Sequence, residues 1–350
     1  MKKLIFVTQK LAYGDPLMGF SHAWVEALAR QVETLVVITN ELGEVRLNPQ
    51  PRIYSLGKEH GHSRWKKLVL LNAAVRSESD ASAFFCHQCP IYLLSALPNL
   101  LHMPRYLWYA HGHLSHTARM ASLFVRKVFT STPFALPLYT HKKQVMGQGV
   151  ETAKWQNTSK VFSENRIRLV HVGRLSAVKN LLPMVYLVKT FKDKGLTATL
   201  DLIGDPATTE DKTYRTELQE DIQKLGVKED VHFLGGLSHD KIREALLRSD
   251  FSLNFSTSAA IDKSLIETAA AGLIPISYNP SFIYTIEDTP MAVPYQKNKT
   301  ADALILNFFG LSQTEKQSLG QSFAKLMAQK HDLDSLAKRL VTEMENENER

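Results

Sequence analysis

The chain has 350 residues, of which 44% are hydrophobic and 22% are charged. This length is sufficient for two domains, and this composition excludes a disordered chain. The formal net charge is +7, and residues 1–160 hold 19 Lys and Arg against 9 Asp and Glu. The basic first part indicates an acidic partner, for which anionic lipid, nucleic acid and a phosphorylated acceptor are the alternatives.

The first residues form a short apolar run at 4–8 behind Lys2-Lys3, as at the start of a signal peptide. The run is too short for one, because Gln9 and Lys10 follow at once, so we expect a buried strand. Nowhere does an apolar run reach the roughly 18 residues of a membrane span. Cys86 and Cys89 are the only cysteines. They lack the second pair of a zinc site, so we expect reduced thiols and a cytoplasmic protein.

The first half of the chain alternates short apolar runs with segments of helical periodicity. Strands are predicted at 4–8, 35–39, 53–56, 83–86, 106–110, 128–130 and 144–146, and helices at 19–30, 64–76, 91–97 and 116–126. Continuous apolar strands between helices predict a parallel sheet covered on both faces. The polar stretch at 151–165 has no periodicity and is predicted to be a linker.

After this stretch the alternation restarts and predicts a second doubly wound α/β unit. Strands are predicted at 167–172, 199–203, 231–234, 251–255 and 274–277, and helices at 181–194, 212–225, 240–248 and 264–271. Two further helices are predicted at 314–329 and 333–345, and the tail at 343–350 is expected to fray.

The ends of the strands in the second half carry the residues most typical of a binding site. The strand at 167–172 runs into Gly173, and the cations Arg174 and Lys179 follow. Glycine allows a ligand to approach the backbone, and the two cations are suited to holding a diphosphate. A solvated turn is the alternative.

Three further segments repeat this arrangement. Gly204 follows the next strand, and Phe233-Leu234 precede two glycines, beside which a flat base fits; ordinary turns are the alternative for both. At 256–272, Asp262 is expected to cap a helix, which would leave the amides of Ser264 and Leu265 free for an anion. Glu267, one turn further, is placed to bind a ribose diol or only to balance the helix dipole.

Taken together, these segments resemble a known family. The segment Gly173-Arg174-Leu175 with Lys179-Asn180, the Phe-Leu-Gly turn, and residues 265–272 resemble the retaining glycosyltransferases of the family 4 type, within the glycosyl transferases group 1. The resemblance implies a GT-B fold, with two Rossmann-like domains that face a central cleft. It implies an N-terminal acceptor domain at 1–155, on which a final helix at 331–350 packs, and a donor domain at 156–330.

The resemblance also implies roles for particular residues. Arg174 and Lys179 would hold the diphosphate of a UDP or GDP sugar, Glu267 its ribose, and Phe233 and Leu234 would flank its base. The sequence departs from the family at Ala259, where many relatives have a glutamate that contacts the sugar. Asp262 and Lys263 are the nearest charges, and Lys263 is a candidate for neutralising the leaving phosphate, with a solvated surface lysine as the alternative.

The first half offers two matching pieces. Residues 14–19 resemble the family's glycine-containing loop, in which Gly19 nears the donor phosphate; the spacing is not that of a dinucleotide site. His111 follows the strand at 106–110 and resembles the residue that approaches the donor sugar, with a histidine packed in a turn as the alternative. We expect His111 to position the sugar.

From these residues we expect a retaining, metal-independent glycosyltransferase without a cofactor, active in bacterial cell-surface polysaccharide or glycolipid synthesis. A nucleotide-sugar epimerase, a non-catalytic sugar-nucleotide binder and a nucleic-acid-binding protein are the alternatives, although nucleic acid leaves the Arg174 and Glu267 motifs unexplained. The acceptor is a glycan, a lipid-linked molecule or a small molecule. The basic segment at 58–76, with Trp65, is able to lie on the inner face of an anionic membrane; a core helix with a solvated basic face is the alternative.

Overall fold

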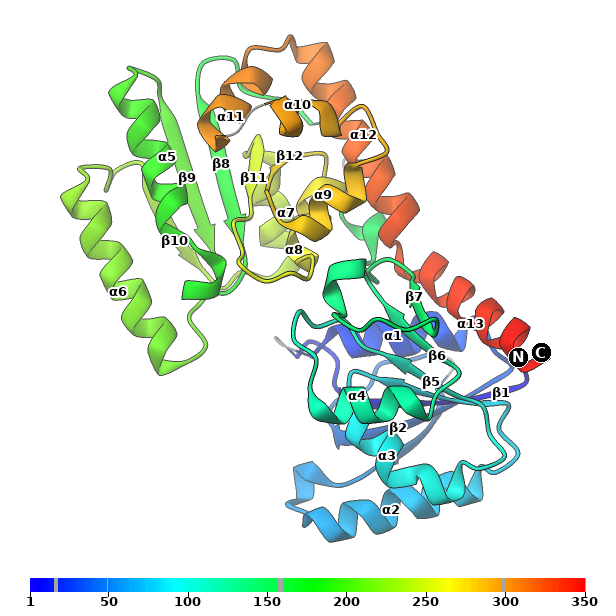
Figure 1. The fold of residues 1–350 in the computed structure, drawn as a ribbon. Coiled ribbons are helices and arrows are strands. Elements are labelled where there is room, and N and C mark those ends of the chain that lie inside the picture. Colours follow the sequence, from blue (N-terminus) through cyan, green and yellow to red (C-terminus); the bar gives the residue numbers. More distant parts are fainter. Residues whose placement is uncertain (16–17, 49, 157–159, 298–299, 350) are drawn as a thin grey trace. The chain divides into compact units, whose positions relative to one another are not determined.

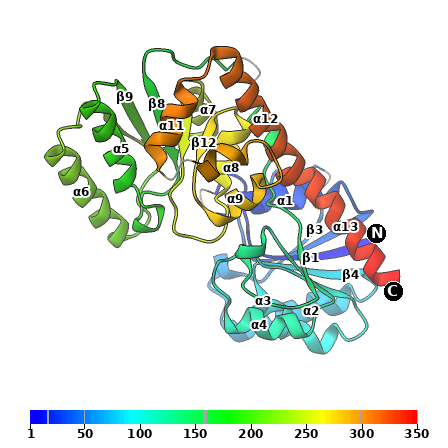
Figure 2. The same cartoon turned by 45° about the horizontal axis from the view of Figure 1, so that its top comes forward.

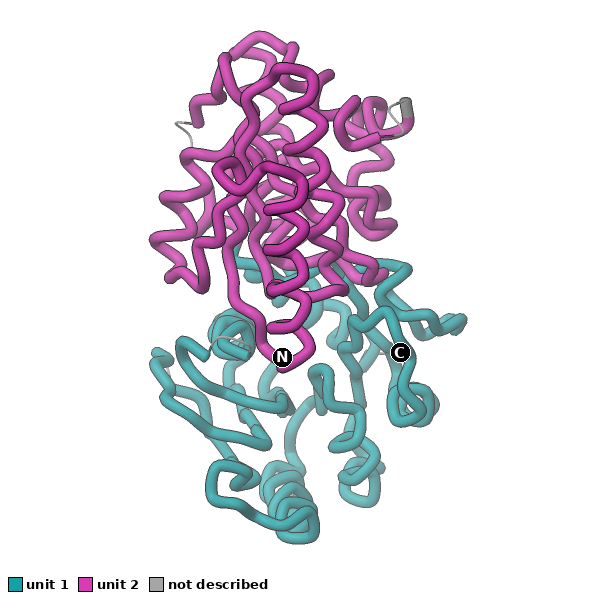
Figure 3. Tube along the Cα trace, turned by 90° about the vertical axis from the view of Figure 1, so that its left-hand side faces the viewer, with its two compact units in different colours: residues 1–151, 333–350 teal, residues 152–332 magenta. Residues whose placement is uncertain are grey.

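The computed structural model describes residues 1–15, 18–48, 50–156, 160–297 and 300–349. Its contacts divide the chain into two compact units (Figures 1 and 3). One unit holds Met1–Glu151 together with Leu333–Arg350, and the other holds Thr152–Asp332. Each unit is built on one parallel sheet, which confirms the predicted α/β class.

The sheet of the first unit has seven strands in the order β3-β2-β1-β4-β5-β6-β7, all parallel. The strands are β1 (Lys3–Leu11), β2 (Thr34–Leu42), β3 (Arg52–Ser55), β4 (Ala83–His87), β5 (Arg105–Trp108), β6 (Lys127–Thr130) and β7 (Lys143–Val145). The helices are α1 (Phe20–Ala29), α2 (Arg64–Ser77), α3 (Pro90–Ala96), α4 (His116–Leu123) and α13 (Leu333–Glu349). The apolar side chains form two cores, one beneath α2, α3 and α4, and the other beneath α1 and α13. Figure 2 shows these two groups of helices on opposite faces of the sheet.

Helix α13 belongs to the first unit along its whole length. Its apolar face is buried from Leu333 to Met344. The Tyr106 hydroxyl donates to the carbonyl oxygen of Met344 (3.0 Å) and to Oδ1 of Asn348 (2.7 Å). The expected fraying of residues 343–350 is therefore wrong for the described residues. Contacts to the sheet, which the acidic composition of the tail does not reveal, hold its last turns.

The sheet of the second unit has five parallel strands in the order β10-β9-β8-β11-β12. The strands are β8 (Ile167–Val172), β9 (Ala198–Ile203), β10 (Val231–Gly235), β11 (Phe251–Leu253) and β12 (Ile274–Ile276). The helices are α5 (Leu182–Asp193), α6 (Thr209–Lys224), α7 (His239–Leu247), α8 (Lys263–Ala270), α9 (Pro280–Ile286), α10 (Ala292–Lys297), α11 (Ala301–Phe309) and α12 (Gln313–His331). Helices α9, α10 and α11 were not predicted. The first two are too short to show a periodicity in sequence.

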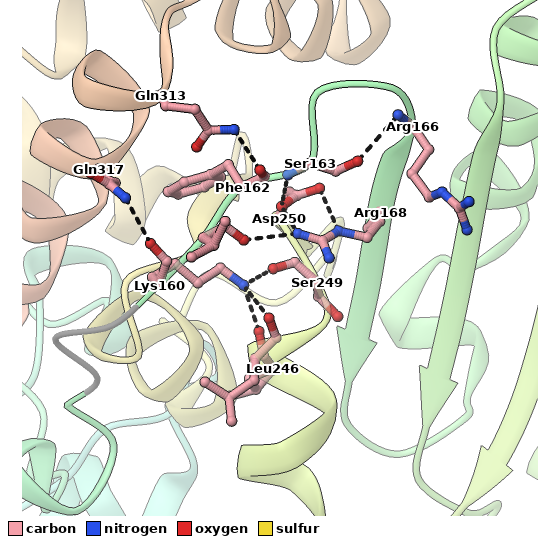
Figure 4. Close-up of polar contacts among 12 residues, drawn as sticks. Lys160, Phe162, Ser163, Arg166, Arg168, Leu246, Ser249, Asp250, Gln313 and Gln317 are labelled. Atoms are coloured by element: carbon pink, nitrogen blue, oxygen red, sulfur yellow. Dashed lines mark hydrogen bonds and ion pairs between the residues drawn. The ribbon is translucent and has the colours of Figure 1, made fainter.

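The predicted linker at 151–165 packs against the second unit. Trp155, Lys160 and Phe162 are buried, so this prediction is wrong for the described part of the stretch; residues 157–159 lie outside it. The Lys160 ammonium donates to the carbonyl oxygens of Leu246 (2.7 Å), Leu247 (3.1 Å) and Ser249, at the end of α7 (Figure 4). Lys160 thus occupies the place where a helix end favours a cation.

A buried ion pair fixes the next residues of the same stretch. Asp250 is buried, and its carboxylate accepts hydrogen bonds from Nε (2.9 Å) and Nη2 (2.6 Å) of Arg168 and from the Ser163 amide (3.1 Å; Figure 4). Helix α12 adds the side-chain amides of Gln313 and Gln317, which donate to main-chain oxygens of this stretch. These contacts attach residues 160–166 to the rest of the second unit.

None of the helices within the described ranges combines the length and the apolar character needed to cross a bilayer.

Candidate functional site

The strand order of the second unit places a ligand site at one position. From β8 the chain builds outward through β9 and β10, and then returns to add β11 on the other side of β8. In open parallel sheets, ligands bind outside the carboxyl ends of the strands at such a reversal. The segment with Arg174 and Lys179 follows β8, and the segment that leads to Asp262 follows β11. Both predicted segments therefore leave the two strands at the reversal.

Glycines allow the ends of β8 and β9 to meet. The Gly173 amide donates to the Ile203 carbonyl (2.9 Å), and the Gly204 amide donates to that of Gly235 (2.8 Å). A Cβ on Gly204 would stand 2.1 Å from the carbonyl oxygen of Gly173, and the φ of Gly204 is +134°. Only glycine fits at residue 204 without a shift of the backbone. Both glycines thus shape the ends of these two strands.

Arg174 leaves this edge with an exposed guanidinium. Its side chain is 46% exposed, and its Nε lies 3.6 Å from Oδ2 of Asp211 in the first turn of α6. A long, exposed contact of this kind is weak and is readily exchanged for a stronger anion. Asp211 was not singled out in the sequence, because the spacing between residues 174 and 211 carries no pattern.

Lys179 and Asp262 form the closest charged contact of the site. The Lys179 ammonium lies 2.6 Å from Oδ1 of Asp262, and Oδ2 of Asp262 accepts a hydrogen bond of 2.6 Å from the Asn254 side chain. Asp262 stands at the N-cap position of α8, but its side chain makes no capping bond. The predicted cap is therefore wrong, because Lys179 and Asn254 engage the carboxylate instead. Asn254 was not among the site residues predicted from the sequence.

The first turn of α8 carries further residues that were predicted to bind the sugar donor. The Leu265 amide donates to the Asp262 carbonyl (3.2 Å), so it is not free for an anion as expected, and its side chain is buried. Ser264 is half-buried. Lys263 and Glu267 lie one turn apart and are also half-buried. Burial lowers the pKa of Lys263 to about 8, and the negative charge of Glu267 partly offsets this effect.

Phe233 and Leu234 lie on β10 at the edge of the sheet. Leu234 is exposed, whereas Phe233 is half-buried. The guanidinium carbon of Arg215, on α6, lies 5.3 Å from the centre of the Phe233 ring. This is a cation–π distance, so one face of the ring has a partner that the sequence did not reveal.

The two remaining predicted residues belong to the first unit. Gly19 precedes α1, and a Cβ there would lie 2.6 Å from the carbonyl oxygen of Asp15, so the turn requires glycine. Pro16 and Leu17, in the same predicted loop, lie outside the described residues. His111 is exposed, and its ring meets that of Tyr109 edge-on at 5.1 Å. Partial removal of water from the ring lowers the pKa of His111. Among the described residues, no group of three metal-ligating side chains is suitably placed to hold an ion.

Comparison with known proteins identifies the second unit. The family model described as "Glycosyl transferases group 1" matches residues 154–288, which hold the strand ends and the start of α8. The chain carries a domain of the glycosyl transferases group 1 family. This family match confirms the resemblance to the glycosyl transferases group 1, and it supports glycosyl transfer as the activity. Gly19 and His111 lie outside the matched residues.

Solved structures extend the likeness to both units at the level of the fold. Anabaena HepE in complex with UDP has a TM-score of 0.72 and 14% identity, and covers 99% of this chain and 100% of its own. A glycosyltransferase from Rickettsia africae has a TM-score of 0.68 and 10% identity, with coverages of 99% and 98%. The lipopolysaccharide outer core galactosyltransferase WaaB has a TM-score of 0.65 and 11% identity, with coverages of 98% and 99%. The chain thus has the GT-B fold. No curated protein matches it in sequence.

Proposed function

We propose that this protein is a retaining glycosyltransferase that moves a sugar from a nucleoside-diphosphate sugar to a hydroxyl acceptor. The observation that carries the proposal is the position of Arg174, Lys179 and the start of α8 beyond the two strands at the reversal of the second sheet. HepE, which shares the fold, was crystallised with UDP and with UDP and glucose, which supports a uridine donor.

In the proposed reaction the bond between the sugar C1 and the diphosphate oxygen breaks, and a bond from C1 to the acceptor oxygen forms on the same face. The proton of the acceptor hydroxyl passes to the leaving diphosphate, so no separate protein base is required. Negative charge grows on the diphosphate as the bond breaks. Arg174 and Lys179 stabilise that charge more in the transition state than in the ground state. These cations replace a metal in the proposal.

Other residues bind and orient the donor. Glu267 accepts the ribose hydroxyls, and Phe233 and Leu234 flank the base. Ala259 provides no carboxylate for the sugar. Lys263, whose pKa is lowered by burial to about 8, supplements the positive charge near the phosphate. His111, with a lowered pKa, is uncharged at neutral pH and positions the sugar.

The first unit provides the acceptor side in this proposal, in bacterial cell-surface glycan or glycolipid synthesis. Trp65 on α2 is 74% exposed, and Val69, one turn later, is 51% exposed. The exposed cations Arg64 and Lys66 flank Trp65. An apolar side chain among cations favours the surface of an anionic membrane, and thus a lipid-linked acceptor. The buried, unbridged thiols of Cys86 and Cys89 support a location at the cytoplasmic face.

The test begins with donor binding. The melting temperature and calorimetric affinity are measured with UDP, GDP, UDP-glucose and GDP-glucose. A nucleotide at 100 times its dissociation constant adds about 2.7 kcal/mol of stability. We expect one nucleotide to bind the wild type and Glu267→Ala to bind it more weakly. An affinity unchanged by Glu267→Ala would contradict the ribose contact, and failure of all four ligands would contradict the function.

Product analysis then separates the reaction classes. Release of nucleoside diphosphate, with the sugar transferred or hydrolysed at retained anomeric configuration, supports the proposal. An epimerised donor indicates an epimerase instead. Binding without release of diphosphate, whatever the acceptor, indicates a non-catalytic binder, which is the outcome that Ala259 would explain.

A further inference from the structure

His171 is a buried histidine in the centre of the candidate site. It lies in β8 and is 1% exposed. Its Nδ1 lies 3.0 Å from the carbonyl oxygen of Leu253 on the neighbouring strand β11. Because a carbonyl oxygen can only accept, Nδ1 carries the hydrogen, and the uncharged ring has its lone pair on Nε2. Within the described residues, Nε2 has no hydrogen-bond partner.

The unpartnered Nε2 and the end of the Lys179 side chain approach the same point. A Cβ on Gly173 would lie 3.2 Å from Nε2 of His171 and 3.9 Å from Cε of Lys179. Because residue 173 is glycine, that point holds no side-chain atom. Nε2 of His171 and the end of the Lys179 side chain therefore border the same space above Gly173.

Asp262, which pairs with Lys179 across the sheet, competes with the substrate for the Lys179 ammonium. An ammonium has three N–H groups, and one of them is directed at Asp262. A diphosphate that binds Lys179 brings a second anion to the same cation. The diphosphate competes with Asp262 for the ammonium, and an ammonium drawn toward the diphosphate can direct another of its N–H groups at an uncharged acceptor.

We propose that His171 is a positioning residue for Lys179, whose ammonium donates a hydrogen bond to Nε2 of His171 when a nucleoside diphosphate occupies the site. Lys179 is held by Asp262 without the ligand and by His171 and the diphosphate with it. This inference rests on the proposed function, since it names how the same site holds its donor.

The surroundings of His171 keep it in the form that accepts. The pKa of His171 is lowered to about 4, chiefly by burial and also by the positive charge of Lys179, against the opposing effects of the Leu253 carbonyl and Asp262. The ring is therefore uncharged at neutral pH and does not repel Lys179. A buried acceptor without a donor is unfavourable, so a state in which Lys179 supplies the hydrogen is stabilised.

The test uses two substitutions that separate the two ring nitrogens. In His171→Asn the side-chain amide replaces Nδ1 and keeps a donor for Leu253, but nothing replaces Nε2. In His171→Gln the amide reaches the place of Nε2 and provides an acceptor oxygen. Calorimetry with UDP, or with GDP if the wild type prefers it, measures the dissociation constant of each variant alone and combined with Lys179→Ala.

We expect His171→Asn to weaken nucleotide binding about tenfold, as for the loss of one hydrogen bond to a charged group, and His171→Gln to stay within about threefold of the wild type. With Lys179→Ala, which itself weakens binding, the two variants should differ by less than about twofold, because coupled residues are not additive. His331→Asn is the control, since His331 is buried in the same unit and contacts Thr285 at 3.3 Å.

Two results would overturn the inference. One is an equal loss for His171→Asn with and without Lys179, which indicates a structural role alone. The other is no advantage of His171→Gln over His171→Asn when both variants melt like the wild type. If the wild type binds neither UDP nor GDP, the proposed donor site itself is refuted, and the inference falls with it.

Discussion

Replacing Gly204 by alanine tests whether the close approach of β8 and β9 builds the donor site. The new Cβ would stand 2.1 Å from the carbonyl oxygen of Gly173, which is backbone and cannot rotate away. One of the two strand ends must therefore move. Gly195→Ala is a matched control, because Gly195 also has a positive φ, +72°, but a Cβ there has no atom within 4 Å.

Both variants place alanine at a positive φ, but alanine tolerates the +72° of Gly195 better than the +134° of Gly204, so their difference reports the clash together with this added strain. Overpacking of this kind destabilises by about 1–3 kcal/mol. For domains of about 150–250 residues, 1 kcal/mol corresponds to roughly 2–4 °C in melting temperature. We therefore expect Gly204→Ala to melt roughly 2–12 °C below Gly195→Ala. The shift of Gly173 should also displace Arg174, so nucleotide affinity should fall only in Gly204→Ala.

Differential scanning fluorimetry and calorimetry with UDP measure the two effects. Equal melting temperatures for the two variants would refute the clash as described. A lower melting temperature of Gly204→Ala with an unchanged UDP affinity would show that the ends of β8 and β9 do not support the nucleotide site. The nucleotide would then bind elsewhere.

Four other substitutions test separate residue roles. Arg174→Ala and Lys179→Ala should each reduce turnover by about 10² or more, the loss found when one electrostatic donor is removed, measured as nucleoside diphosphate released from the donor. Arg168→Met leaves the buried carboxylate of Asp250 without its cation and should lower the free energy of unfolding by about 3–5 kcal/mol in urea titrations. Trp65→Ala should weaken binding to phosphatidylglycerol vesicles by about tenfold or more, because burial of a large apolar side chain contributes about 1.5–3 kcal/mol.

Each of these variants has a control on the same unit. Lys189→Ala removes a cation from α5, where Lys189 pairs with Asp193, and should leave turnover unchanged. Arg166→Met changes an exposed arginine beside β8 and should alter stability by less than about 0.5 kcal/mol. Tyr139→Ala removes another exposed aromatic side chain and should not alter vesicle binding. A control that behaves like its partner would contradict the corresponding role.

The alternation of apolar runs and helical segments predicts most of the fold. A strand of a parallel sheet is buried on both faces, so each strand must be apolar along its length and can be recognised on its own. The runs at 4–8 and 167–172 correspond to β1 and β8. Residues 151–165 were misjudged as a linker because their polar composition does not reveal that the Lys160 ammonium is buried in the second unit, where it donates to carbonyl oxygens at the end of α7.

The site is harder to predict than the fold, because its contacts join distant residues. The motifs place Arg174, Lys179 and Glu267 near strand ends and a helix start. The partner of Lys179 is Asp262, 83 residues further along the chain, and it was expected to cap α8. Whether a carboxylate caps its own helix or pairs with a distant cation depends on how β8 and β11 lie together, which local spacing does not encode.

Because α13 belongs to the first unit, the first unit can finish folding only after the second unit has been synthesised. The sheet of that unit needs Leu336, Leu340 and Met344 to cover one face, and these residues leave the ribosome after the entire second unit. The second unit is continuous in sequence and is able to fold first, reversing the usual N-terminal priority. A nascent chain stalled before residue 333 therefore exposes the apolar face of the first unit that α13 covers in the folded protein, and chaperones would recognise such a face.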